Sequence, residues 1–375
     1  MDEREAEVAE SAAKNGGWDL GIWGLAFGYF AAYAPYSALT KAVTKGLLPY
    51  HRGRVDGLVL VPMTVVASFF AMIAFLSFKR WWRYAGTRRV LGRDIPFPSI
   101  WTALSGLCSA TIIITTTLAY TFDGVSIVFI MLLMRGGVLM IAPMVDLVAR
   151  RPVRWFSWVG LMLSLVAVVV ADRGGDVRLT FACGVNVLAY LAGYFIKLQV
   201  MSRRAKSTDE NANVRYFVEE QLVSTPALLL FLGALAIVDR GPVMHLVREG
   251  FVGFPRSGLL LEAFAIGVLS QGTGIFGGLI LLDKRENTFC VPVNRSSSIL
   301  AGVVASFSLA WLFHDHLPGF FELLGATLVT GAILFLTVPP MIERARARRL
   351  RDSIPRAPRV PADLVAAVQE EGDGQ

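Results

Sequence analysis

Residues 125–145, VSIVFIMLLMRGGVLMIAPMV, form an apolar run that is interrupted by a single charged residue, Arg135. A helix of this length spans roughly 30 Å, which matches the hydrocarbon thickness of a lipid bilayer. The run therefore predicts a transmembrane helix with a guanidinium group near the bilayer centre. Burying that group costs at least about 2.5–3.5 kcal/mol, so we expect it to face the interior of a helix bundle or a wet cavity.

Similar runs occur throughout the chain, which has 375 residues, of which 54% are hydrophobic and only 17% charged. A soluble domain would carry about a quarter charged residues. Ten runs approach the length of a membrane span, at residues 20–39, 57–78, 100–120, 125–145, 155–171, 179–201, 217–238, 257–282, 288–313 and 319–338. The sequence therefore predicts an all-α polytopic membrane protein with ten transmembrane helices.

The distribution of Lys and Arg predicts the orientation of these helices. The connection after the second run carries six of them between Lys79 and Arg93, so we assign it to the cytoplasm. The cytoplasmic connections then hold 15 basic residues, the opposite side holds nine, and both termini are cytoplasmic. The net charge of +7 thus reflects membrane topology and does not indicate nucleic-acid binding. An Arg-rich, Ala-rich and Val-rich composition favours a bacterial inner membrane, with an endomembrane as the eukaryotic equivalent.

The short connection at 172–178 divides the ten runs into two groups of five. Five is an odd number, so the two groups face opposite ways and predict inverted repeats at 19–172 and 178–340 with a site between them. An acidic N-terminal tail, 1–18, lacks the pattern of a signal peptide, and the C-terminal tail, 341–375, is basic and then acidic. We expect both tails to be extensions of a single membrane domain.

Two internal echoes support the repeats. The fourth run of each half carries an arginine followed by small residues, Arg135 before GG and Arg295 before SSS. The first run of each half carries tyrosines at helical spacing, namely Tyr29, Tyr33 and Tyr36 in one half and Tyr190 and Tyr194 in the other.

Residues 118–172, which begin LAYTFDGVSIVFIMLLMRGG, resemble the hallmark half of the drug/metabolite transporter superfamily, in its EamA-like and solute carrier family 35-like branches. Residues 294–336 resemble the corresponding segment of the second half. The resemblance implies ten helices in two inverted repeats and secondary transport by alternating access. The chain departs from the family in lacking a GALNK-like run, in having Asp123 and Gly124 in place of a small pair, and in its long 241–256 loop.

The charged residues within the runs are the first candidates for a site. Arg135 has no carboxylate within two helical turns, and Arg295 follows Pro292, which frees backbone carbonyls. Each arginine is either an anion-binding group or a structural group bonded to carbonyls or to an acid of another helix. We favour anion binding, because intramembrane ionisable residues mark transport pathways.

Further candidates share a helix face or a polar side chain inside a run. Asn186, Tyr190, Tyr194 and Lys197 fall on one face, although Lys197 also lies close enough to a run end to snorkel to the surface. The predicted substrate-binding set is Arg135, Arg295, Tyr29, Tyr33, Tyr190, Tyr194, Lys197, Asn294, Ser298, Thr116 and Gln271.

The acidic residues and the glycines are assigned other roles. Glu262 is the candidate for proton coupling or for an ion pair with an arginine. Glu219 and Glu220 open the seventh run and are expected to be solvated at the cytoplasmic surface. Gly274 and Gly278 form a GxxxG pattern that is expected to set close helix packing.

The sequence contains no cofactor motif, no metal-ligand set and no paired nucleophile and base, so we expect no enzyme activity, cofactor or metal. The expected partners are a small-molecule substrate and the lipid bilayer, and a homodimer is left open. The predicted function is secondary-active transport of a small, anionic organic metabolite. Two alternatives are an exporter of amphipathic drugs or metabolites with structural arginines, and a non-transporting membrane sensor or scaffold.

Overall fold

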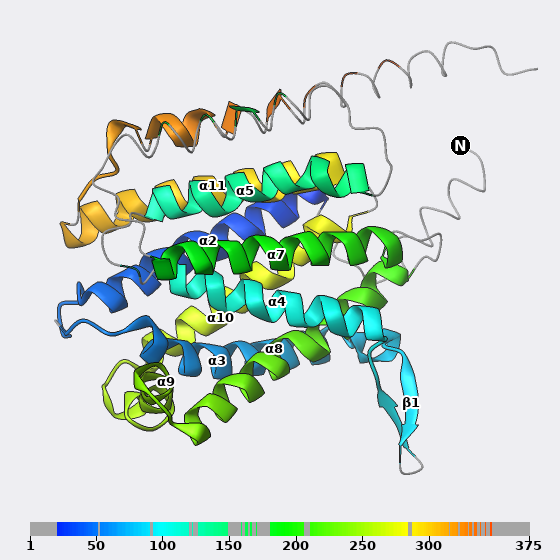
Figure 1. The fold of residues 1–375 in the computed structure, drawn as a ribbon, viewed down its shortest axis with the longest axis horizontal. Coiled ribbons are helices and arrows are strands. Elements are labelled where there is room, and N and C mark those ends of the chain that lie inside the picture. Colours follow the sequence, from blue (N-terminus) through cyan, green and yellow to red (C-terminus); the bar gives the residue numbers. More distant parts are fainter. Residues whose placement is uncertain are drawn as a thin grey trace, which may run out of the picture. The chain divides into compact units, whose positions relative to one another are not determined.

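The computed structural model describes residues 21–51, 53–90, 93–119, 122, 127–148, 181–205, 211–283, 287–314 and 316–321, with scattered positions in 159–170 and 323–346. Eight of the ten predicted runs form helices of 20 to 27 residues. They are α2 (Ile22–Lys45), α3 (Gly57–Phe78), α4 (Ile100–Ala119), α5 (Ile127–Val148), α7 (Phe181–Arg204), α8 (Ala212–Val238), α10 (Leu260–Leu282) and α11 (Asn287–Phe313), and they run alongside one another in Figure 1.

Local signals set where several of these helices begin and end. The Asp56 carboxylate caps α3 by accepting a hydrogen bond of 2.8 Å from the Leu58 backbone N–H. Gly46 ends α2 in the left-handed conformation, with φ of 67°, and its N–H closes the last turn. Apolar runs between such signals become helices because a helix satisfies all of its own backbone polar groups.

Six helices of the described part are long and apolar enough to cross a membrane: α3, α4, α7, α8, α10 and the Val293–Phe313 part of α11. Large apolar side chains on these helices face outward, among them Phe70, Phe231 and Trp311, the last of which is 81% exposed. Water would disfavour such a surface and lipid matches it. The chain is an integral membrane protein with an all-α membrane domain.

The predicted runs at 155–171 and 319–338 lie largely outside the described residues, as do the tails 1–18 and 347–375. The count of ten spans, the inverted repeats and the cytoplasmic termini therefore stay predictions.

The helix contacts between the two halves of the sequence occur in matching pairs. α2 packs against α10 and α11, and α7 packs against α4 and α5. α10 also packs against α3, and the corresponding pair in the other direction is α4 with α8. Two further contacts, α5 with α11 and α3 with α8, each join equivalent helices of the two halves. Each contact thus has a counterpart when α2, α3, α4 and α5 are exchanged for α7, α8, α10 and α11. The third helix of each half thus lies against the first two helices of the other half: α4 against α7 and α8, and α10 against α2 and α3.

Two glycines at equivalent places allow these crossings. A methyl group on Gly267 of α10 would lie 2.2 Å from the Thr64 carbonyl oxygen and 2.5 Å from the Ala67 Cβ of α3. A methyl group on Gly106 of α4 would lie 2.9 Å from the Glu220 carbonyl oxygen and 2.6 Å from the Val223 Cβ of α8. Both helix pairs therefore approach to backbone contact, which only glycine permits.

The structure corrects the expectation that residues 241–256 are simply a long loop. They contain a helix, α9 (Pro242–Val252), followed by a short 3-10 turn at Phe254–Arg256. Gly241 and Pro242 provide the start signal, and α9 packs on α3 and α8. At 11 residues it is too short for a membrane span.

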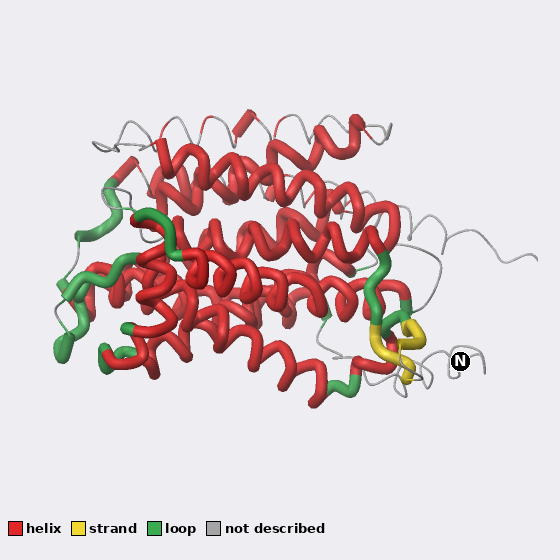
Figure 2. The backbone as a smooth tube through the Cα atoms, turned by 60° about the horizontal axis from the view of Figure 1, so that its bottom comes forward, coloured by secondary structure: helices red, strands yellow, loops and turns green. Residues whose placement is uncertain are grey.

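One predicted connection also has regular structure. Strands β1 (Thr87–Val90) and β2 (Arg93–Pro96) form an antiparallel hairpin after the second membrane helix, drawn yellow in Figure 2. These are the strands of the described residues, which are otherwise helical or irregular.

The close crossing at Gly267 yields a stability prediction. We expect Gly267→Ala to lower the free energy of unfolding by about 1–3 kcal/mol, because the new methyl group overpacks the α10–α3 contact. Gly233→Ala in α8 is the matched control: no atom lies within 4 Å of its added methyl group, so helix propensity should make it neutral or slightly stabilising. Thermal unfolding in detergent compares the two, and equal midpoints would contradict the packing role.

Candidate functional site

Two arginines occupy the interior of the bundle. Arg135 is 2% exposed and Arg295 is fully buried. Arg135 lies eight residues after the first residue of α5, Ile127, and Arg295 lies eight residues after the first residue of α11, Asn287. Because α5 and α11 pack against each other, the two guanidinium groups enter the same region of the core.

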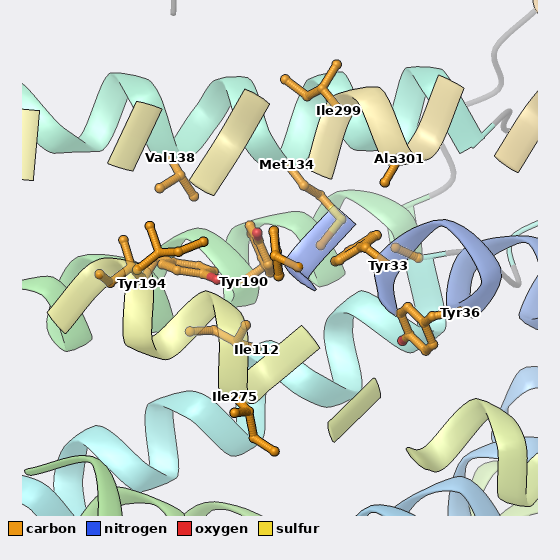
Figure 3. Close-up of a cluster of buried hydrophobic side chains, with 14 of the residues drawn as sticks. Tyr33, Tyr36, Ile112, Met134, Val138, Tyr190, Tyr194, Ile275, Ile299 and Ala301 are labelled. Atoms are coloured by element: carbon orange, nitrogen blue, oxygen red, sulfur yellow. The ribbon is translucent and has the colours of Figure 1, made fainter. Parts of the chain in front are cut away.

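Tyrosines from α2 and α7 surround these guanidinium groups. Arg135 donates hydrogen bonds to the hydroxyls of Tyr190 and Tyr33. Arg295 donates to the same Tyr190 hydroxyl over 3.2 Å, and its guanidinium carbon stands 4.4 Å from the centre of the Tyr194 ring. Figure 3 shows Tyr33, Tyr190 and Tyr194 lying between Met134 and Val138 on one side and Ile112 and Ile275 on the other. The cluster is thus held by hydrogen bonds and by cation–π contacts.

The arginine charges are not neutralised by acids of the described part of the chain. Neither Arg135 nor Arg295 forms an ion pair with a described carboxylate. Arg135 Nε and Arg295 Nε and Nη2 are buried without a hydrogen-bond acceptor among the described residues. Buried donors of charged groups left unpaired cost several kcal/mol in total. Arg135 and Arg295 therefore present unused donors and excess positive charge in the core.

A cavity of about 80 Å³ adjoins this cluster. One water needs roughly 10–15 Å³ of such volume, so the cavity has room for several waters or for a small anion. Arg135 lines it, together with residues of α2, α4, α7, α8, α10 and α11.

The cavity brings together seven of the eleven predicted substrate-binding residues: Arg135, Tyr29, Tyr33, Tyr194, Lys197, Asn294 and Thr116. Two more predicted residues do not line the cavity but contact residues that do. Tyr190 bonds Arg135, and Arg295 lies over the ring of Tyr194.

The remaining two predicted residues act through neighbours. The Gln271 side chain donates a hydrogen bond of 2.9 Å to Gln221 Oε1, and Gln221 lines the cavity. The Ser298 hydroxyl donates to the Arg295 carbonyl oxygen over 2.9 Å, within its own helix. Both are buried, and neither lines the cavity.

Glu262 lies away from the arginines. Its carboxylate accepts a hydrogen bond from the hydroxyl of Tyr50, a residue that is 66% exposed between α2 and α3. This bond raises the pKa of the Tyr50 hydroxyl above its ordinary value. Among the described residues Glu262 has neither an arginine partner nor a place in the cavity lining.

The expectation that Glu219 and Glu220 are solvated is wrong, because they are only 2% and 4% exposed. Glu219 fastens the β1–β2 region to α8 by accepting hydrogen bonds from the Gly86 and Ser99 backbone and from Thr102. α8 begins at Ala212, several residues before the apolar run, so both acids lie within the helix rather than at its N-terminus.

Glu220 is a charged cavity residue that the sequence analysis did not assign to the site. Its Oε1 forms an ion pair of 2.6 Å with Lys197 Nζ and accepts a hydrogen bond of 2.5 Å from Ser109 Oγ. Lys197 is thus paired within the bundle, where its side chain is 12% exposed. A signal existed in the polar face of Ser105, Ser109 and Thr116 on α4, which needs polar partners on a facing helix.

The GxxxG pattern in α10 divides between two roles. A methyl group on Gly278 would come 3.2 Å from the Phe217 ring, which is a tight helix contact, whereas one on Gly274 would meet no atom within 4 Å. Gly274 lines the cavity, so its missing side chain keeps space open instead of bringing helices together.

Comparison of the chain with protein-family models and with curated proteins finds no match. The arrangement of the described side chains therefore carries the functional argument.

The shared acceptor predicts a measurable role for Tyr190. We expect Tyr190→Phe to lower the free energy of unfolding by about 1.5–3 kcal/mol, because two buried guanidinium groups lose the oxygen that both contact. Tyr84→Phe is the matched control, since it removes an arginine–tyrosine bond, Arg83 Nη2 to Tyr84 Oη at 2.9 Å, that is solvent-exposed. The control should change stability by less than about 0.5 kcal/mol. Equal losses in thermal or denaturant unfolding would contradict the buried role.

Proposed function

We propose that this protein is a secondary-active membrane transporter that moves a small organic anion by alternating access. The observation that carries the proposal is the pair of buried arginines, Arg135 and Arg295, with excess charge and unused donors beside a polar cavity inside a membrane domain. An anion in that cavity would accept from Arg135, which lines it, and would offset the positive charge of both arginines.

The symmetric exchange of helix contacts supports the proposed inverted repeats. α2 with α10 and α11 has its counterpart in α7 with α4 and α5, and the Gly267 and Gly106 crossings are equivalent. Two such groups of helices can rock about a site between them, which is the arrangement of inverted-repeat transporters. The likeness of residues 118–172 and 294–336 to the drug/metabolite transporter superfamily points the same way.

Each side chain of the site has a role in this proposal. Arg135 offers a planar donor fork suited to a carboxylate or phosphate, and Arg295 adds a second positive charge behind it. The tyrosines position the guanidinium groups and give the cavity aromatic walls with hydroxyl handles. Lys197 supplies a third cation whose charge is already balanced by Glu220.

The cavity also bears on the competing exporter hypothesis. At about 80 Å³ this cavity is well below the roughly 300–1,000 Å³ typical of drug-sized ligands, whereas a second pocket of about 910 Å³, lined in part by Leu118, Phe122 and Asn186, lies within that range. The charged lining of the smaller cavity favours a small anion over a large, charge-neutral amphipathic compound. We therefore place the small-anion hypothesis first.

Uptake by reconstituted liposomes tests the proposal, with radiolabelled sulfate, succinate and glycerol 3-phosphate as probe anions. We expect Arg135→Gln and Arg295→Gln each to lower transport by about 10- to 100-fold, because each removes a charged donor worth about 1.5–3 kcal/mol. Arg203→Gln, at an exposed end of α7, is the control and should transport normally. Wild-type affinity in both core variants, or no transport of any probe by the wild type, would sink the proposal.

Gly274 offers a test that leaves every charge in place. We expect Gly274→Leu to abolish uptake, since its Cβ would meet no atom within 4 Å and the rest of the side chain would fill cavity space. Gly233→Leu, on α8 away from the cavity lining, should preserve both uptake and stability. Unchanged uptake in Gly274→Leu would show that the substrate does not pass through this cavity.

A further inference from the structure

The Lys197–Glu220 ion pair is a second charged element at the cavity, and anion binding by the arginines leaves Glu220 without a role. Both side chains line the cavity. Lys197 Nζ lies 2.6 Å from Glu220 Oε1 and donates to Ser109 Oγ over 2.8 Å. Apart from the ammonium group, the carboxylate is contacted only by hydroxyls, Ser109 at 2.5 Å and Ser105 at 3.5 Å, among the described residues.

Other carboxylates of the described chain are unsuited to sense the cavity. Glu219, next in sequence, points to the hairpin region and is held there by Gly86, Ser99, Thr102 and Arg215. Glu262 bonds Tyr50 outside the cavity. Glu220 is therefore the one carboxylate among the described residues that line the cavity.

We propose that Glu220 is the proton-binding residue of the transporter and that Lys197 is shared between Glu220 and the transported anion. This inference rests on the proposed anion transport and names its coupling ion. An anion entering beside Arg135 attracts the Lys197 ammonium group, which then leaves Glu220. A buried carboxylate that loses its cation costs about 3–5 kcal/mol, and taking up a proton removes that cost.

The step balances in charge and in protons. One proton from the compartment that supplies the anion adds to a Glu220 carboxylate oxygen, while Lys197 keeps its own proton and bonds the anion. On the opposite side the anion leaves, Lys197 returns to Glu220, and the carboxyl group releases its proton. A monoanion thus crosses with one proton and no net charge.

The surroundings of Glu220 contain few other groups that could take this proton. From α4 it is faced by Ser105, Ser109 and the Cys108 thiol, and from α7 by Lys197. Its own helix contributes Tyr216, whose hydroxyl donates to Ser105 over 2.6 Å.

No described charged side chain of the other helices packed on α8 forms an ion pair or a hydrogen bond with Glu220. α3 carries no charged residue, and α10 contributes Gln271, bonded to Gln221. From α9, Arg248 and His245 contact Asp239 at the far end of α8, and Arg83 of the short turn at Trp81–Tyr84 bonds Tyr84. Tyr194 of α7, which also lines the cavity, is a second titratable group near Lys197, and Glu220→Gln separates a proton on Glu220 from one on Tyr194.

The test measures sulfate binding to the full-length protein in detergent from about pH 5.5 to about pH 8.5, by calorimetry and by thermal shift. Sulfate stays a dianion over this range, so any pH dependence belongs to the protein. We expect the affinity of the wild type for sulfate to fall about tenfold for each unit of rising pH, over the range where binding takes up one proton. Glu220→Gln, which mimics the protonated carboxyl, should bind sulfate tightly with no pH dependence.

Two further variants serve as controls for the sulfate-binding measurement. The pair Lys197→Met with Glu220→Met replaces the ion pair by apolar side chains that a bundle core accepts, and it should bind weakly at every pH. Asp239→Asn, which alters an exposed ion pair at the far end of α8, should keep the wild-type slope. In liposomes, Glu220→Gln should lose succinate accumulation driven by a pH gradient, whereas Asp239→Asn should keep it.

The outcomes separate the two proposals. A wild-type sulfate affinity without pH dependence, or a slope that survives in Glu220→Gln, overturns the coupling role of Glu220 and leaves the anion site intact. If sulfate fails to bind the wild type at any pH, and succinate and glycerol 3-phosphate fail too, the anion site itself is wrong.

Discussion

One tyrosine hydroxyl that accepts from two buried arginines is the constraint around which the core is arranged. Tyr190 of α7 joins Arg135 of α5 to Arg295 of α11, so three helices meet at a single oxygen. A neutral hydroxyl can orient two guanidinium groups but cannot cancel their charges, which repel strongly in a medium of low dielectric constant. The cavity beside Arg135 gives that positive charge access to a polar space, and no described carboxylate pairs with it.

Small residues elsewhere bring the tyrosines to that place. Gly267 and Gly106 let α10 and α4 approach the backbones of α3 and α8, so these two helix pairs pack closely. α2 and α7 are then held between helices of the other half, with their tyrosine faces turned toward the centre. Gly277 continues the same logic, because a methyl group there would lie 2.9 Å from the Tyr29 ring. Shape and charge of the site thus depend on residues that carry no chemistry themselves.

Much of this arrangement follows from local signals in the sequence. Span-length apolar runs predict the long helices, and lone arginines within two of them, with tyrosines at helical spacing, predict a charged, aromatic core. The pairing of Lys197 with Glu220 did not follow, because it depends on how far α8 extends before its apolar run and on which faces of α7 and α8 meet. The helix α9 was missed for a related reason: a short amphipathic segment has no span-length signal, and its stability comes from packing on α3 and α8.

The two charged elements of the cavity differ in a way that bears on the proposed coupling. The arginines form no ion pair with a described carboxylate, whereas Lys197 and Glu220 form an ion pair with each other. An anion alone must break that ion pair, and a proton alone must displace a lysine from its carboxylate, so each event by itself is costly. When both occur together, the anion takes the lysine and the proton takes the carboxylate, and no buried charge is left unpaired. Coupling between anion and proton is then a consequence of charge pairing in a low-dielectric core, and by linkage each ligand must strengthen the binding of the other.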